Sequence, residues 1–245
     1  MISHILLDIE GTTCPVSFVT STLFPYASAA LSDFLERHKN DDSVIQLIDA
    51  AEAEWIKDFD DESMELRSRT EHSMEPKCLK IGSYLQLLIS SDKKSTALKD
   101  IQGKIWREGY ETGRIRSVLF KDATESLKRW HEKGLKLAIY SSGSVEAQHL
   151  LYKYTNEGSI EELFEHWFDT HIGNKKDQTS YARIASTMNC EPRNILFISD
   201  NSDECDAARG AGLSTLYSLR EGNPQQEPRD HPVINSLKDV DPWIH

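Results

Sequence analysis

Three apolar segments of the chain, each typical of a buried strand, end in polar residues. Asp8 and Glu10 follow the first segment, Ser141 and Ser142 follow the second, and Asp200 follows a later one. The carboxyl ends of parallel strands meet at one edge of a sheet, and ligands bind in α/β proteins just beyond that edge. We therefore expect these side chains to lie close together in the folded chain.

These residue types suit phosphoryl transfer to a carboxylate. An aspartate can attack phosphorus in line and form an acyl phosphate. A second acid can protonate the leaving oxygen and then activate water. A hard cation such as Mg²⁺ would offset the repulsion between carboxylate and phosphate, while a lysine and a hydroxyl would hold the phosphoryl oxygens. The candidate lysine is Lys175, in the sequence His-Ile-Gly-Asn-Lys-Lys at 171–176.

The elements that position these residues follow from the hydrophobic pattern. Apolar runs at 5–9, 135–140, 194–199 and 214–217 are typical of strands, and the last three alternate with amphipathic helical segments. Such alternation indicates βαβ units. The fold class is therefore α/β, with a doubly wound, Rossmann-like parallel sheet as its core.

Helical periodicity replaces the strand pattern in the region before that core resumes. Four successive segments with apolar residues at i, i+3 and i+4 predict a bundle, and the acidic stretch 58–75 predicts a loop or a short exposed helix. The bundle is inserted just after the first strand, so we expect a helical cap that acts as a substrate lid. The expected domains are 1–17 plus 117–245 for the core and 18–116 for the cap.

Several polar residues near the strand ends have a simpler interpretation as helix caps. Asp122 with Glu125, and Asn201 with Glu204, have the spacing of capping boxes. Ser144 is expected to cap the helix after the second strand. On this interpretation Glu204 is structural rather than part of the site.

Composition narrows the class of protein. The 245 residues carry a net charge of −12, which argues against nucleic acid or an anionic membrane as a partner. No segment approaches the roughly 20 apolar residues of a membrane span, and the early apolar run is too short for a secretory signal. The four scattered cysteines are expected to be free thiols. We expect a cytoplasmic monomer, with a nuclear location left open by the small size.

The candidate residues match, in order, the four motifs of the haloacid dehalogenase-like phosphohydrolase superfamily. The sequence Asp-Ile-Glu-Gly-Thr at 8–12 resembles the first motif, Asp-x-Asp-x-Thr, and Ala-Ile-Tyr-Ser at 138–141 resembles the second. Lys175 resembles the third motif, and Ile-Ser-Asp at 198–200 the fourth. The departure is Glu10, where most members have aspartate.

Longer segments narrow the resemblance to the enolase-phosphatase (acireductone synthase) family of methionine salvage. They are Leu-Asp-Ile-Glu-Gly-Thr-Thr at 7–13, Phe-Pro-Tyr at 24–26, Thr-Ala-Leu-Lys at 96–99, Gln-Gly-Lys-Ile-Trp at 102–106 and Tyr-Ser-Ser-Gly-Ser-Val-Glu-Ala-Gln at 140–148. The resemblance covers nearly the whole chain and includes the expected cap, the part that would set substrate choice.

The resemblance implies a bifunctional, Mg²⁺-dependent enzyme. It would enolise 2,3-diketo-5-methylthiopentyl 1-phosphate, a small sugar-like substrate, and then dephosphorylate the enol to acireductone. Asp8 would be the nucleophile and a metal ligand, and Glu10 would be the acid/base and bind the metal through its backbone carbonyl. Asp200 would complete the protein ligands of one Mg²⁺ per subunit, while the role of Asp203 is open. The residues implied to bind the substrate phosphate are Ser141, Ser142 and Lys175.

Two other functions stay open at this point. The first is a different small-molecule phosphatase, or a dehalogenase, on the same core, and the resemblance of the cap argues against it. The second is a non-catalytic phosphate-binding regulatory protein. The intact acidic residues and lysine argue against that one.

Overall fold

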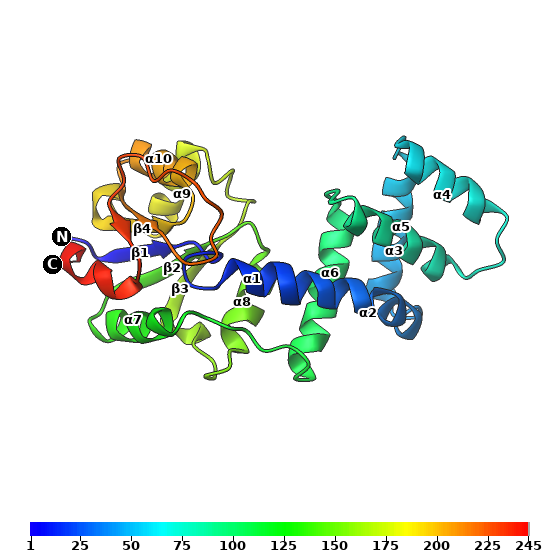
Figure 1. Cartoon of the computed structure of the whole chain (residues 1–245), viewed down its shortest axis with the longest axis horizontal. Coiled ribbons are helices and arrows are strands. Elements are labelled where there is room, and N and C mark those ends of the chain that lie inside the picture. The colour runs from blue at the N-terminus through cyan, green and yellow to red at the C-terminus, as the bar shows by residue number, and fades with distance from the viewer. Residues whose placement is uncertain (245) are drawn as a thin grey trace. The chain divides into compact units, whose positions relative to one another are not determined.

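The computed structural model describes residues 1–244 and contains two compact units. One unit comprises residues 1–21 together with the chain from Arg116 onward, and the other is Thr22–Ile115. The larger unit holds the sheet, and the smaller one consists of helices (Figure 1). The lid role of the smaller unit, and with it the functional division at residues 17 and 117, stays a prediction.

A six-stranded parallel sheet forms the larger unit, with strand order β3-β2-β1-β4-β5-β6. Its strands are β1 (His4–Leu7), β2 (Lys136–Tyr140), β3 (Phe164–Phe168), β4 (Ile195–Ser199), β5 (Ser214–Ser218) and β6 (Val233–Ile234). In the sheet register, Leu7 of β1 stands between Ile139 of β2 and Ile198 of β4. Starting from β1, the chain adds β2 and β3 on one side of the sheet and then β4, β5 and β6 on the other side. The carboxyl ends of β2, β1 and β4 therefore form the topological switch point.

Helices cover both faces of this sheet, which explains why its central strands are apolar on both sides. In Figure 1, α7 (Lys121–Glu132) and α8 (Val145–Lys153) lie on one side, and α9 (Gln178–Thr187) and α10 (Ser202–Gly210) on the other. Every residue of β4 is buried. The predicted doubly wound α/β core is confirmed.

The sequence pattern missed two strands. The sequence of β3 is Phe-Glu-His-Trp-Phe, whose polar residues break an apolar run. This strand is at the edge of the sheet, so part of it is exposed and needs no continuous apolar face. The strand β6 has only two residues, too few to show a periodicity.

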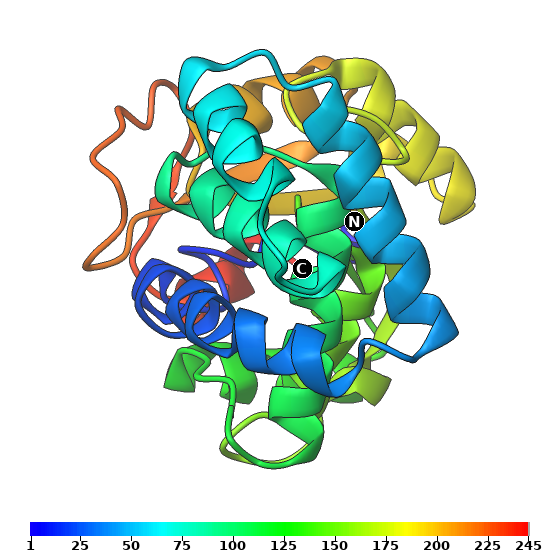
Figure 2. The same ribbon diagram turned by 90° about the vertical axis from the view of Figure 1, so that its right-hand side faces the viewer.

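The smaller unit is a helical bundle with its own apolar core, seen from a second side in Figure 2. Its helices are α2 (Phe24–Arg37), α3 (Asp42–Ile56), α4 (Asp61–Glu71), α5 (Lys77–Ser90) and α6 (Thr96–Glu111). The four predicted stripes of apolar residues are the buried faces of α2, α3, α5 and α6. Most of the acidic stretch forms α4. Asp60 caps the start of this helix, because its side chain accepts a hydrogen bond from the Glu62 amide at 3.2 Å.

Short helical turns complete the chain. They are α1 (Val16–Phe18), a π-helical turn (Val19–Leu23) and 3₁₀ turns at Glu161–Leu163, Pro192–Asn194 and Leu237–Trp243. No helix within residues 1–244 is long and apolar enough to cross a membrane. All four cysteines are free thiols, as predicted.

The capping box predicted at Asp122 is wrong. The helix α7 begins at Lys121, which places Asp122 inside its first turn. The Asp122 carboxylate instead accepts hydrogen bonds from the Leu237 amide at 2.7 Å and from Arg220 Nη1 at 3.0 Å. The spacing Asp-x-x-Glu therefore does not by itself predict a capping box, because the aspartate can instead accept hydrogen bonds from a distant segment of the chain.

Candidate active site

Asp8 follows β1 directly and begins a tight loop. Its side chain is buried, and its amide continues the sheet with a hydrogen bond of 3.0 Å to the Ile198 carbonyl. The Ile9 carbonyl accepts hydrogen bonds from the amides of Thr12, Thr13 and Cys14, which closes the loop. The backbone turns at Gly11 with φ +70°, a conformation that favours glycine. The loop holds Asp8 and Glu10 at the carboxyl edge of the sheet.

Lys175 joins two carboxylates inside the core of this unit. Its Nζ lies 2.6 Å from Asp8 Oδ1 and 2.7 Å from Glu204 Oε2. Burial alone would lower the pKa of Lys175, but the charges of Asp8 and Glu204 outweigh it and hold that pKa above its ordinary value. The lysine is therefore a fixed positive charge beside the proposed nucleophile.

Three hydroxyl groups position the loop that bears Lys175. Tyr140, at the end of β2, donates to the Gly173 carbonyl at 3.0 Å, and Tyr181 of α9 donates to the Lys175 carbonyl at 2.7 Å. Ser180 Oγ donates to the Asn174 carbonyl at 2.8 Å. Because its backbone is held from two elements, the lysine side chain can be directed at Asp8.

Asp200 follows β4 and packs against the backbone of the first loop. A side chain on Gly11 would place its Cβ 2.2 Å from Asp200 Oδ2, so the space left by the glycine is where this carboxylate lies. Burial, with the charges of Asp8 and Glu204, raises the pKa of Asp200 to about 7. The structure thus brings Asp8 and Asp200 together from two strand ends, as expected, and Lys175 joins them from the loop between β3 and α9.

Glu204 is the site residue that sequence reasoning missed. Asn201 does cap α10, since its Oδ1 accepts hydrogen bonds from the amides of Asp203 and Glu204. The Glu204 side chain, however, turns into the site, where Ser199 Oγ lies 3.0 Å from its Oε2 in addition to the Lys175 contact. The available signal was its position in the first turn of the helix that follows the strand end bearing Asp200.

Asp203 and Lys176 belong to the surface instead. Lys176 Nζ and Asp203 Oδ2 form an exposed pair at 2.9 Å, and Arg229 Nη2 lies 2.5 Å from Asp203 Oδ1. Asp203 thus takes part in a surface ion-pair cluster, and whether it assists the metal stays open.

The serines after β2 occupy the neighbouring strand end. Ser141 is buried, and its Oγ accepts a hydrogen bond from the Gly143 amide at 3.2 Å. Ser144 caps α8 as predicted, because its Oγ accepts from the Ala147 amide at 3.3 Å. The β1–β2 register places Ser141 and Ser142 level with the loop after Asp8, at the N-terminus of a helix, where anions are favoured.

Negative charge exceeds positive charge in this cluster. The carboxyl groups of Asp8, Glu10, Asp200 and Glu204 interact electrostatically with one another and with the ammonium group of Lys175. Glu10 is exposed on this unit, yet the surrounding protein atoms desolvate its carboxyl group. This desolvation, together with the charge of Asp8, raises the pKa of Glu10. Burial and the same charge raise the pKa of Glu204.

The metal-free protein is expected to lose stability as the pH rises from about 4 to about 7. The folded-state pKa of Asp200, about 7, lies above the value of roughly 3.9 expected in the unfolded chain. The folded state therefore holds a proton that the unfolded state has released, and this contribution to stability is lost as the pH rises through about 7. Urea unfolding in the presence of EDTA at several pH values measures the effect.

The Asp200→Asn variant is the control for this pH dependence, since it removes the carboxyl group and leaves every histidine in place. Its free energy of unfolding should vary less over the same pH range than that of the wild type. Identical pH slopes for the two proteins would show that Asp200 does not titrate as described.

Comparisons with known proteins agree with this architecture. A family model described as a haloacid dehalogenase-like hydrolase matches residues 2–212. The chain is 73% identical over 244 residues to the enolase-phosphatase E1 of Synechococcus sp. (strain CC9902), with 100% of both chains covered. It is 53% identical to the enolase-phosphatase E1 of Parasynechococcus marenigrum (strain WH8102), with 99% of each chain covered. These relatives give no support to a nuclear location.

Solved structures show the same fold. The UTR4 protein of Saccharomyces cerevisiae is 30% identical and superposes with a TM-score of 0.75, covering 96% of this chain and 98% of that one. The L-2-haloacid dehalogenase of Xanthobacter autotrophicus, at 17% identity and a TM-score of 0.54 over 100% and 98% of the two chains, shares the fold alone. Over its full length, this chain belongs to the enolase-phosphatase E1 family of the haloacid dehalogenase-like hydrolases.

Proposed function

We propose that this chain enolises 2,3-diketo-5-methylthiopentyl 1-phosphate and then hydrolyses the phosphate ester, a bifunctional reaction of methionine salvage that yields acireductone. The observation that carries the proposal is the buried contact of 2.6 Å between Lys175 Nζ and Asp8 Oδ1, at the carboxyl edge of the sheet and beside Asp200. Identity to enolase-phosphatases extends through the helical unit as well as the core, which supports the same substrate class.

Asp8 is the proposed nucleophile for phosphoryl transfer. One of its carboxylate oxygens attacks phosphorus, the bond from phosphorus to the substrate oxygen breaks, and the leaving oxygen takes a proton from Glu10. The carboxylate of Glu10 then takes a proton from water as that water attacks the aspartyl phosphate, which releases phosphate and restores Asp8. The raised pKa of Glu10 suits both steps, because the group can hold a proton nearer neutral pH than an ordinary glutamate.

Lys175 is proposed to neutralise and orient the reacting groups. Its ammonium group holds one Asp8 oxygen and is positioned to meet the phosphoryl oxygens. Glu204 contacts the same ammonium group at 2.7 Å, which helps to hold the lysine beside Asp8. Ser141 and Ser142 are proposed to donate hydrogen bonds to the phosphate at the start of α8.

The site fits one Mg²⁺. Its donors are hard oxygens, and the carboxyl groups of Asp8, Asp200 and Glu204 outnumber the single ammonium group of Lys175. The proposed ligands are the carboxylates of Asp8 and Asp200 and the main-chain carbonyl of Glu10, completed by water. Within residues 1–244, no three acidic, histidine or cysteine side chains form a metal site by themselves, and the proposed set asks for only two. When bound, the cation offsets the repulsion between carboxylate and phosphate and polarises a substrate carbonyl.

Glu10 is the residue proposed to distinguish this chemistry from simple phosphate hydrolysis. Enolisation requires removal of a proton from the carbon next to a carbonyl group. Glutamate is one methylene longer than the aspartate of the usual motif, so its carboxylate can reach that carbon as well as the leaving oxygen.

The Glu10→Asp variant should therefore lose enolisation more than hydrolysis of a simple aryl phosphate. We expect at least about a tenfold larger loss for the diketone phosphate, within the range that a misplaced general base costs. An aryl phosphate has no carbon proton to remove, and its phenolate leaves with little need of an acid. Steady-state rates on the two substrates measure the difference, and equal losses would refute this role of Glu10.

A substrate panel tests the proposed function. Wild-type chain and Mg²⁺ are incubated with the diketone phosphate, other small phosphate esters and a 2-haloacid, and phosphate or halide release is measured. The diketone phosphate should have the highest kcat/KM. A preference for another ester would instead make the chain a different phosphatase, and no release from any compound would favour a non-catalytic binding protein. We also propose that the chain acts as a cytoplasmic monomer.

A further inference from the structure

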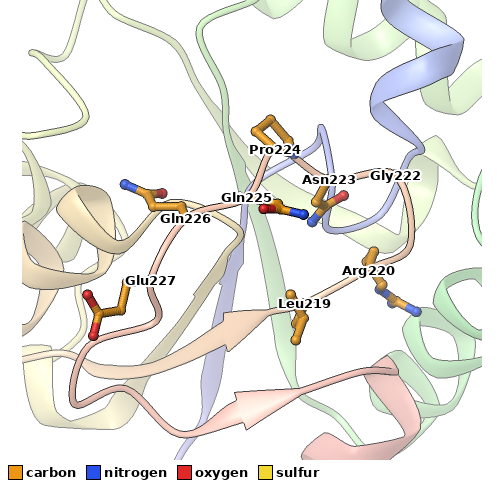
Figure 3. A pocket seen from close by; sticks show the side chains of 8 residues that line it. All are labelled: Leu219, Arg220, Gly222, Asn223, Pro224, Gln225, Gln226 and Glu227. Atoms are coloured by element: carbon orange, nitrogen blue, oxygen red, sulfur yellow. The ribbon is translucent and has the colours of Figure 1, made fainter.

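The loop 219–227, which follows β5, lines an open cavity of about 450 Å³ (Figure 3). In Figure 3 the Asn223 side chain is directed at the segment that follows β1, whereas Glu227 points away from it. The loop thus approaches the chain segment that bears Asp8 and Glu10.

Side chains of β5 and of this loop hold the backbone of that segment. Asn223 Nδ2 donates to the Gly11 carbonyl at 3.0 Å and to the Ser218 carbonyl at 3.2 Å, and Ser218 Oγ donates to the same Gly11 carbonyl at 2.9 Å. Arg220 Nη2 donates to the Thr12 carbonyl at 3.3 Å. Because both partners of Asn223 are carbonyl oxygens, only the nitrogen of its amide can face them.

These contacts fix the direction of the Glu10 carbonyl. The Gly11 amide donates to the Cys14 carbonyl at 2.8 Å, and the Gly11 carbonyl is held by Asn223 and Ser218. Both peptide planes that meet at Gly11 are therefore restrained. Glycine is otherwise the most freely rotating residue, and the Glu10 carbonyl lies in the same rigid plane as the Gly11 amide. Restraint of Gly11 thus restrains Glu10.

The Asp200 side chain also lies beside Gly11. The position that a Gly11 Cβ would occupy lies 2.2 Å from Asp200 Oδ2 and 2.8 Å from Asn223 Nδ2, so the two side chains are neighbours across the glycine. The loop also reaches the chain just beyond Asp200, because Gln226 Oε1 accepts a hydrogen bond from the Ser202 amide at 3.1 Å. One loop therefore touches both segments that bear the acidic residues.

We propose that Asn223 is a positioning residue for the metal-binding end of the site, and that loop 219–227 sets the spacing between the Glu10–Gly11 peptide and Asp200. The proposal rests on the proposed function for the identity of the reaction, but its first readout is metal binding by the chain itself. Outer groups that orient metal ligands typically change affinity or activity by roughly 10- to 100-fold when removed.

The test compares Asn223→Leu, which keeps the size of the side chain and removes the donor, with Gln225→Ala, an exposed change in the same loop. Mg²⁺ binding to the metal-free chain is measured by calorimetry, followed by kcat and KM on the diketone phosphate. For Asn223→Leu we expect a Kd for Mg²⁺ raised about tenfold and a kcat lowered about tenfold, with KM nearly unchanged. Gln225→Ala should match the wild type.

A second variant covers the case in which Asn223→Leu unfolds. Ser218→Ala removes the other donor to the Gly11 carbonyl and should weaken Mg²⁺ binding in the same direction by a smaller factor. Wild-type Mg²⁺ affinity in both variants, or equal losses in Gln225→Ala, would overturn the proposal. If the wild type binds Mg²⁺ but releases no phosphate from any ester, the proposed function fails, and the calorimetric comparison still decides the role of Asn223.

Discussion

Replacement of Asp8 by asparagine is expected to abolish phosphate release and to leave the chain folded. An amide has nearly the shape of a carboxylate but is a far weaker nucleophile, so the acyl phosphate cannot form. Lys175 keeps its contact of 2.7 Å with Glu204, and the removal of one carboxylate relieves repulsion in a cluster rich in negative charge. We expect kcat to fall on the order of 10⁴-fold or more, as measured by Mg²⁺-dependent phosphate release.

Asp203→Asn is the matched control for this experiment. It makes the same chemical change at an exposed carboxylate that pairs with Lys176 and Arg229 at the surface. Its turnover should stay near that of the wild type. Phosphate release by Asp8→Asn at a rate similar to that of the control would assign the nucleophile to another residue.

Replacement of Lys175 by methionine is expected to cost both activity and stability. The change leaves the carboxylates of Asp8 and Glu204 close together and buried without their shared positive charge. Removal of one partner from a buried ion pair typically costs about 3–5 kcal/mol. Urea unfolding in EDTA should show a loss of this size, and phosphate release should fall by at least about 10²-fold because an electrostatic contact with the phosphoryl oxygens is lost.

Lys176→Met provides the comparison at the adjacent position. The Lys176 side chain is 56% exposed and pairs with Asp203 at the surface, so its removal should change stability by about 0.5 kcal/mol or less. Lowering the pH should narrow the difference between the two variants, since protonation relieves the repulsion left by Lys175→Met. Equal destabilisation by both substitutions would contradict the buried charge cluster.

The fold could be predicted from the sequence because its central strands are buried on both faces. Such strands are continuous apolar runs, and the polar residues at their ends, Asp8 and Asp200, mark where the chain reaches the carboxyl edge. The edge strand β3 was not predicted, because its exposed positions hold polar residues such as Glu165. Local pattern therefore predicts the centre of the sheet better than its margins.

The remaining site residues depend on contacts that no local pattern contains. Glu204 lies in the sequence of a capping box, and only its contact with Lys175 distinguishes a site residue from a cap. Asn223 reaches the Gly11 carbonyl across more than two hundred positions of sequence, from a loop whose polar composition is typical of an exposed turn. Such partners emerge only when the sheet has brought the strand ends together.

The most direct test of the central claim supplies the wild-type chain with the diketone phosphate and Mg²⁺ and follows the ultraviolet absorbance of the enol and the release of phosphate in the same cuvette. We predict that the enol signal appears first and that stoichiometric phosphate follows it. Both signals should be absent in EDTA, and phosphate release should be absent in Asp8→Asn. Phosphate release without an enol signal, or no turnover of this ester by a chain that hydrolyses others, would contradict the claim.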